Sequence, residues 1–195
     1  MHHVLEIGWP LQGWSDHGVS EAIYLADPDG NGIEIYRDRP RNEWPVAHGE
    51  LQMVTEPLDA TGLLALAVDT ASPWMMPAGA VMGHLHLHVT SIPQAQAFYC
   101  DVLGFDLMQR YGPSALFVSA GGYHHHVGLN TWAGVGAPPA PAGSAGLRYF
   151  TVMLPDEASL DVLVARVQAA GHAVTQQADG WYLHDPASNG IRLTH

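Results

Sequence analysis

Histidine is the residue with which this sequence could most readily do chemistry, with 13 copies in 195 residues. Residues 124–126 are three consecutive histidines in "GGYHHHVGLN". Three more, His84, His86 and His88, occupy every second position of "GHLHLHV". Neutral imidazole is a common ligand of zinc, iron, nickel and copper. Both stretches are therefore candidates for a metal site.

Composition and charge limit the classes of protein to which the chain can belong. It has 19 acidic and 7 basic side chains, for a formal net charge of −12. Nucleic-acid binding depends on clustered Lys and Arg, so we expect neither a nucleic-acid nor a membrane partner. The single cysteine, Cys100, excludes an intrachain disulfide framework and a thiolate-rich zinc site. No apolar run approaches the roughly 18 residues of a membrane span, and no signal peptide is evident, which favours a cytoplasmic protein.

An internal repeat indicates the architecture that positions these residues. "LADPDGNGIEIY" (residues 25–36) is similar to "LHDPASNGIRLT" (residues 183–194). Each copy predicts two strands joined by a turn that contains Asp-Pro and Asn-Gly. A glycine that ends a predicted helix precedes each copy, Gly8 in the first and Gly171 in the second.

The second half of the chain predicts two modules of the order β-α-β-β-β. In residues 81–132, a strand leads to a helix that begins at Ser91 and ends at Gly104, and three strands follow. Residues 147–195 repeat this order, after a Pro/Gly/Ala-rich linker at 133–146. The helix of the second module has a predicted apolar face made of Leu160, Leu163, Val164 and Val167.

The residues before this domain predict a partial module. Residues 1–40 contain a helix end and closing strands, so we expect the chain to begin partway through a repeat, with the first strand of that module upstream. Residues 41–80 predict a connector arm, in which a short helix over 58–68 is weakened by Gly62. The predicted fold class is α+β, with one complete domain of paired βαβββ modules over 81–195 and a partial module before it.

These motifs resemble the vicinal-oxygen-chelate superfamily of glyoxalases, bleomycin-resistance proteins and extradiol dioxygenases. "GHLHLHVTSIPQAQAFYCDVLGF" is similar to the opening strand and helix of the superfamily, and "DPDGNGIEIY" is similar to its closing strand. The layout resembles two-domain catechol-2,3-dioxygenase-like proteins, and the chain looks like the end of their first domain followed by the second. The resemblance implies that two modules form a cup around a divalent metal.

A signature of extradiol enzymes is similar to "SDHGVSEAIYLADPDGNGIE" (residues 15–34). By this resemblance Glu34 is a carboxylate ligand of Fe(II) or Mn(II), His17 is an acid/base residue, and Tyr24 hydrogen-bonds a substrate oxygen. Two histidines and one carboxylate leave metal positions open for the catecholate and O₂. The two histidines of this set are expected upstream of Met1.

The later domain predicts a different set of candidates. Strand alternation puts the histidines of "GHLHLHV" on one face, and the resemblance directs this face into the cup. His84 together with His126 or His124 is then the best metal-binding group, with Zn or Ni as further candidate metals. Residues 123–132 also predict a strand, whose alternation puts His124 and His126 on one face and His125 on the other, pointing outward to the surface.

The last module departs from the pattern of a metal site. Its positions equivalent to the family's ligands carry Tyr149 and, in place of Glu34, Arg192. A fixed cation repels a metal ion and cannot coordinate it. We therefore expect Tyr149 and Arg192, with His86 of the first module, to line a substrate cup.

Three functions remain open at this point. The first is cleavage of a catechol ring with O₂ by a metal-dependent extradiol enzyme, whose activity this form of the chain need not retain. The second is a glyoxalase-like lyase or isomerase, in which a carboxylate moves a proton of a dicarbonyl substrate. The third is a non-catalytic small-molecule-binding or scaffold domain. We expect a homodimer and a small aromatic or dicarbonyl substrate.

Overall fold

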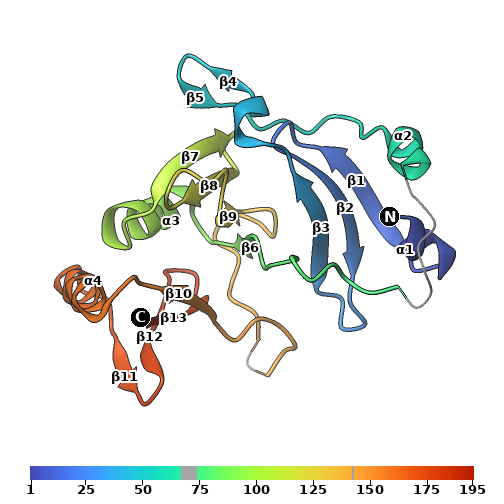
Figure 1. The fold of residues 1–195 in the computed structure, drawn as a ribbon. Helices are drawn as coiled ribbons and strands as arrows, with labels where there is room; N and C mark the ends of the chain where they lie inside the picture. The colour runs from blue at the N-terminus through green and yellow to red at the C-terminus, as the bar shows by residue number, and fades with distance from the viewer. Residues whose placement is uncertain (67–73, 142) are drawn as a thin grey trace. The chain divides into compact units, whose positions relative to one another are not determined.

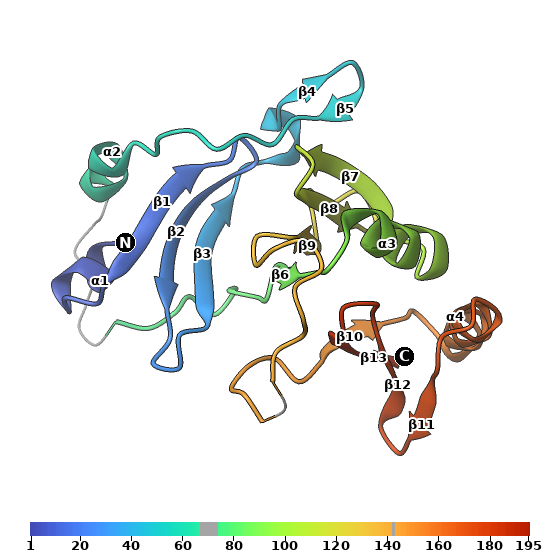
Figure 2. The ribbon, with the colours of Figure 1, turned by 180° about the vertical axis from the view of Figure 1, so that it is seen from behind.

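The chain divides into two compact units, Met1–Met82 and Gly83–His195, which are drawn in Figures 1 and 2. The computed structural model describes residues 1–66, 74–141 and 143–195. None of the helices within these ranges is long and apolar enough to cross a membrane.

The first unit is built on a three-stranded antiparallel sheet in the order β1-β2-β3. Its elements are α1 (His2–Glu6), β1 (Leu11–Asp16), β2 (Ser20–Ala26), β3 (Gly32–Asp38), η1 (Arg41–Glu43), β4 (Val46–Ala47), β5 (Glu50–Leu51) and α2 (Ala60–Ala65). The Asp-Pro and Asn-Gly turn predicted from the first copy of the repeat joins β2 to β3.

A small core holds the first unit together. Val4 of α1, Ile23 of β2 and Leu58 of the connector are buried against one another. The helix α2 begins after Asp59, whose carboxylate accepts a hydrogen bond from the Gly62 amide at 2.9 Å. The short helix expected over residues 58–68 is confirmed in α2, while residues 67 and 68 lie outside the described ranges.

The second unit contains two modules with one topology (Figure 1). The first module comprises β6 (Leu85–His88), α3 (Ile92–Gln96), the π-helical turn η2 (Ala97–Val102), β7 (Asp106–Tyr111), β8 (Ala115–Ser119) and β9 (Val127–Asn130). The second comprises β10 (Phe150–Met153), α4 (Glu157–Ala169), β11 (Thr175–Gln177), β12 (Gly180–His184) and β13 (Gly190–Thr194).

The strand orders confirm the α+β class with βαβββ modules. They are β6-β9-β8-β7 in the first module and β10-β13-β12-β11 in the second. In each module the first strand pairs in parallel with the closing strand, and the other pairs are antiparallel. A parallel pair needs a long crossover connection, which α3 with η2 supplies in one module and α4 in the other.

The core of the second unit lies between the sheets and their helices. Leu87 and Val89 are buried, whereas His86 and His88, which alternate with them, are exposed, so the predicted alternation along β6 is confirmed. The predicted apolar face of α4 is also confirmed, because Leu160, Leu163, Val164 and Val167 are all buried in the core. This packing leaves the histidine face of β6 turned away from the core.

The predicted helix ends of the first module are confirmed. The Ser91 hydroxyl accepts a hydrogen bond from the Gln94 amide at 3.4 Å and caps α3. Gly104 follows the helix with a φ of +87°. A side chain at this position would also come within 2.8 Å of the Arg166 guanidinium, which donates to the Leu103 carbonyl.

Two expectations for the triple histidine are wrong. The strand β9 begins only at Val127, so residues 124–126 lie in the loop that precedes it. His125 was expected at the surface, but it is only 9% exposed, and His124 is fully buried. Strand alternation cannot assign faces to residues that are not in a strand.

Candidate active site

The extradiol-like residues come together in the first unit. Tyr24 on β2 pairs directly with Glu34 on β3, and its hydroxyl donates to Glu34 Oε1 at 3.1 Å. His17 lies in the turn between β1 and β2. Its Nε2 lies 2.5 Å from the Tyr24 hydroxyl and 3.9 Å from Glu34 Oε1. The structure therefore joins three residues that the sequence singled out.

The conformation of the turn that carries His17 is held by its two neighbours, Asp16 and Gly18. Gly18 has a φ of +74°, a conformation that favours glycine. Its amide donates to Asp16 Oδ1 at 2.8 Å. Arg39 binds the two oxygens of Asp16 at 2.7 Å each, and this hydrogen-bonded guanidinium holds the pKa of Asp16 below its usual range.

Hydrogen-bond geometry sets the proton positions in this site. His17 Nδ1 lies 2.7 Å from the Val54 carbonyl oxygen, and a carbonyl can only accept, so Nδ1 carries a hydrogen. A neutral His17 then presents a lone pair at Nε2 that accepts the Tyr24 hydrogen, so the phenol donates to His17 or to Glu34 and not to both at once. A doubly protonated His17 would instead donate to the Tyr24 oxygen and leave the Tyr24 hydrogen to Glu34.

Partial burial of the site keeps the Tyr24 hydroxyl protonated, so that it can donate a hydrogen bond. The side chains of His17 and Glu34 are 22% and 18% exposed. Burial, and then the neighbouring carboxylate of Glu34, raise the pKa of Tyr24 well above its usual value. The phenol therefore stays protonated at neutral pH between an imidazole and a carboxylate, an arrangement that can pass a proton.

Glu34 is a suitable single ligand for a divalent cation. Its carboxylate is largely shielded from water, and carboxylate oxygen suits Fe(II) and Mn(II). Within residues 1–66, 74–141 and 143–195, however, no three His, Cys, Asp or Glu side chains are arranged to hold a metal ion. The described residues thus supply one fitting ligand and do not complete a three-ligand set.

The histidines of the second unit form a packed cluster before β9. The rings of His84 and His125 lie 4.2 Å apart between centroids, and those of His84 and His124 lie 6.4 Å apart. Nδ1 of His124 and Nδ1 of His125 are 2.8 Å apart, so one donates to the other. The His84 ring thus lies nearer to the ring of His125, which was expected at the surface, than to that of His124.

His126 is engaged in a way that disfavours metal binding. Its Nδ1 accepts a hydrogen bond from the Ala120 amide at 3.2 Å and lies 2.9 Å from the Ser119 hydroxyl. Since Nδ1 accepts, the neutral ring carries its hydrogen on Nε2. Burial, and then the charge of nearby His84, lower the pKa of His126. Neither nitrogen therefore offers a lone pair to a metal in this arrangement.

The residues expected to line a cup lie in two sheets. His86 is exposed on β6, with its ring 4.9 Å from that of Trp132. Tyr149 and Arg192 belong to the second module, where the Arg192 guanidinium lies 5.4 Å above the Tyr149 ring. Arg192 Nη1 binds Asp179 at 2.9 Å and Nε binds Thr151 at 3.1 Å. Arg192 is thus held as part of an ion pair.

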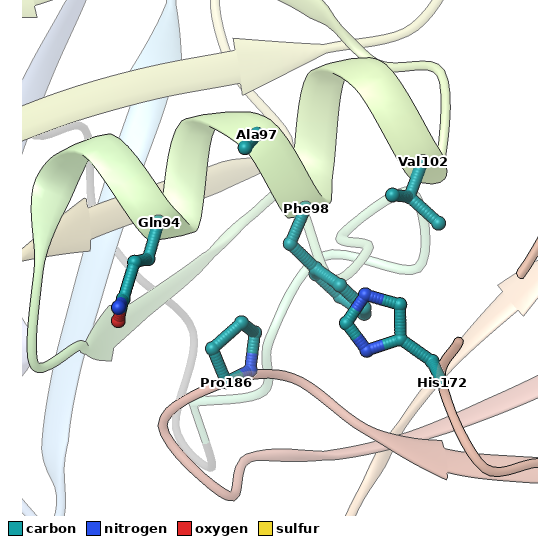
Figure 3. A pocket seen from close by; sticks show the side chains of 6 residues that line it. All are labelled: Gln94, Ala97, Phe98, Val102, His172 and Pro186. Atoms are coloured by element: carbon teal, nitrogen blue, oxygen red, sulfur yellow. The ribbon is translucent and has the colours of Figure 1, made fainter. Parts of the chain in front are cut away.

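An open cavity lies on the helix side of the second unit (Figure 3). Its volume is about 470 Å³, and its walls are formed by Gln94, Ala97, Phe98, Val102, His172 and Pro186. The Phe98 and His172 rings meet edge to face at 4.8 Å between centroids. No motif of the sequence pointed to this cavity, because its walls come from a helix and from two loops of the other module.

Sequence comparison decides the family. Residues 81–183 match the profile of the glyoxalase/bleomycin resistance protein/dioxygenase superfamily. The chain belongs to this superfamily. The resemblance predicted from the opening and closing motifs is thereby confirmed.

One relative in the superfamily is a catechol-2,3-dioxygenase of Bacillus subtilis (strain 168). It is 51% identical to this chain over 178 residues, which cover 90% of the chain and 62% of the relative. The chain thus spans less than two thirds of that protein's length.

Solved structures with a similar fold are less alike in sequence. A lactoylglutathione lyase from Agrobacterium tumefaciens is 22% identical, with a TM-score of 0.46, over 60% of this chain and 94% of its own. A glyoxalase/bleomycin resistance protein/dioxygenase from Alicyclobacillus acidocaldarius is 19% identical, with a TM-score of 0.44, over 57% of this chain and 89% of its own.

Proposed function

We propose that the chain takes part in extradiol cleavage of a catechol by O₂, and that His17, Tyr24 and Glu34 belong to the active site. The observation that carries the proposal is the hydrogen-bonded series from His17 through Tyr24 to Glu34. The 51% identity to a catechol-2,3-dioxygenase supports it. A catechol gives up protons on binding and cleavage, so a positioned base and phenol suit this chemistry.

Each residue has a distinct proposed role. His17 takes and returns a proton of the substrate through Nε2, the nitrogen that faces Tyr24. Tyr24 stays protonated and, when substrate is bound, turns its one hydrogen from Glu34 to a substrate oxygen. Glu34 supplies a carboxylate ligand to the metal and orients Tyr24 through their hydrogen bond. Ring cleavage adds both atoms of O₂ to the catechol and needs no external reductant.

We propose a divalent metal as cofactor, with Fe(II) or Mn(II) as candidates. Such an ion would hold both catechol oxygens and polarise them as a Lewis acid. Glu34 is the ligand that we assign to the metal, because Glu34 is the carboxylate of the site and is shielded from water.

The expected homodimer and the expected cytoplasmic location stay predictions. Light scattering tests the first, and cell fractionation tests the second.

A non-catalytic role is the second candidate for the last module. Arg192 stands in the repeat where Glu34 stands in the first copy, and its charge is balanced by Asp179 at 2.9 Å. A guanidinium cannot bind a metal ion. This observation favours a binding or scaffold role for residues 147–195, and a mixed Glu/His/Gln site of the glyoxalase type has less support.

Oxygen uptake tests the proposal on a form of the protein that also supplies the two metal ligands that the described residues lack. This protein is loaded with Fe(II) or Mn(II) without air and given catechol, and the expected result is one O₂ consumed for each catechol. His17→Gln should slow this uptake by about 10²- to 10⁴-fold, the usual contribution of a general acid/base. His172→Gln, at the cavity of the second unit, is the matched control and should stay within about twofold. Equal activity of both variants would contradict the role of His17.

A further inference from the structure

The connector after β5 pairs with the end of β1. The amides and carbonyls of Asp16 and Glu56 exchange two hydrogen bonds of 2.9 Å each. Two residues earlier, the Val54 amide donates to the His17 carbonyl at 3.1 Å. The connector thus runs beside His17 as an added strand.

Val54 meets the His17 side chain as well as its backbone. The Val54 carbonyl oxygen lies 2.7 Å from His17 Nδ1. We propose that Val54, through this carbonyl, is a positioning residue that fixes neutral His17 with its hydrogen on Nδ1. The basic lone pair is then on Nε2 and faces Tyr24. The use of that lone pair in catalysis rests on the proposed function, whereas the choice of tautomer does not.

The two groups that hydrogen-bond the His17 ring, the Tyr24 hydroxyl and the Val54 carbonyl, differ in the ring protonation with which they are compatible. A hydroxyl both donates and accepts, so Tyr24 is compatible with a hydrogen on either nitrogen of His17. A carbonyl only accepts, so Val54 is compatible with a hydrogen on Nδ1 alone. The Val54 carbonyl therefore sets the tautomer of His17. In many functional histidines, likewise, the hydrogen bond made by one ring nitrogen determines the protonation of the other.

Close packing keeps the carbonyl in place. Met53, next to Val54, is 7% exposed, and Leu58 further along is anchored in the core of the first unit. A side chain on Gly18 would approach Pro45 to 2.8 Å and Val54 Cγ2 to 3.4 Å. The turn at Gly18 and the connector at Pro45 and Val54 are thus closely packed beside the His17–Val54 hydrogen bond.

Nitrogen-15 NMR of the histidine rings tests this proposal on the full chain, without metal or substrate. A protonated ring nitrogen and an unprotonated one have widely separated chemical shifts, so the spectrum reports the tautomer directly. In the wild-type chain at a pH where His17 is neutral, Nδ1 should have the shift of a protonated nitrogen. Nε2 should have the shift of an unprotonated one.

Three variants separate Val54 from its neighbours. Tyr24→Phe should leave the tautomer unchanged, since the carbonyl and not the phenol sets it. Val54→Ala keeps the backbone amide and carbonyl and should also leave it unchanged. Val54→Pro removes the amide that binds the His17 carbonyl, so the His17 shifts should move toward a mixture of tautomers.

The outcomes are decisive even if Val54→Pro does not fold. A wild-type spectrum with the hydrogen on Nε2 overturns the proposal, and so does a change of tautomer in Tyr24→Phe. A folded Val54→Pro chain that keeps the wild-type shifts also overturns it. Because the spectra need no turnover, a result of the O₂-uptake experiment bears on the proposed function and not on the role of Val54.

Discussion

The two closing hairpins, β2–β3 and β12–β13, have the same turn and different chemistry. In both, an aspartate accepts two backbone amides through Oδ1 at 2.8–2.9 Å and the side-chain amide of an asparagine through Oδ2 at 2.8 Å. The aspartates are Asp27 and Asp185. The repeated sequence therefore encodes the same local structure twice.

The hairpins diverge at one cross-strand pair. Tyr24 faces Glu34 in the first, and Tyr182 faces Arg192 at the same place in the second. Tyr24 donates to Glu34, whereas the Tyr182 hydroxyl donates to Asp179, which also binds Arg192. Hydrogen bonding to Tyr182 and then to Arg192 holds the pKa of Asp179 low. Exchanging an acidic for a basic residue thus replaces a tyrosine–carboxylate hydrogen bond by an ion pair on the same local fold.

Matched tyrosine variants test this difference in activity. Tyr24→Phe should reduce catechol-dependent O₂ uptake by about 10²-fold or more, because we propose the phenol as the hydrogen-bond donor to the substrate. Tyr182→Phe, at the equivalent position, should stay within about twofold of the wild type. Steady-state kinetics of both variants make the comparison. A loss of similar size in both would show that the second hairpin also serves the reaction.

Matched aspartate variants test the difference in burial. Asp185 is 5% exposed and accepts a hydrogen bond from Tyr99 at 3.0 Å, whereas Asp27 is in an exposed turn. Asp185→Asn puts an amide against two donors and should lower the free energy of unfolding by roughly 1–3 kcal/mol. Asp27→Asn should change it by about 0.5 kcal/mol or less. Urea denaturation measures both, and equal losses would contradict the distinction.

The smallest expected effect is on the free energy of unfolding of the first unit at acid pH. Arg39 lowers the pKa of Asp16, so the unfolded chain binds a proton more readily than the folded one. The stability from this pair is therefore present above the unfolded pKa of about 3.9 and is lost as pH falls through the folded pKa. Partial exposure limits it to about 1 kcal/mol or less. Asp16→Asn should remove this part of the pH dependence in denaturation curves recorded between neutral and acid pH.

Local patterns made much of the fold predictable from the sequence. The Asp-Pro and Asn-Gly turns fix the register of a hairpin, so Tyr24 and Glu34 could be expected on neighbouring strands. The apolar period of α4 predicted the helix of the second module, and the capping residues Ser91 and Gly104 predicted the ends of the helix of the first. These features depend on residues close together in the chain.

The features that escaped prediction depend on the main chain of distant or irregular segments. Val54 contacts His17 through a carbonyl, a group that every residue has and that leaves no mark in the sequence. The hydrogen bond from the Ala120 amide to His126 Nδ1 likewise involves a main-chain group and could not be predicted from the residue types. His125 was assigned by strand alternation, which fails in the loop before β9.

Catechol-dependent O₂ uptake by Glu34→Gln and Arg192→Gln tests the central claim most directly. The claim is that the hairpin of the first unit carries the chemistry and its repeat in the second unit does not. Glu34→Gln should lose at least about 10²-fold in activity, since it removes the carboxylate that we propose as the cation ligand and the partner of Tyr24. Arg192→Gln should stay within about twofold. An active Glu34→Gln variant, or an Arg192→Gln variant that is equally inactive, would contradict the account.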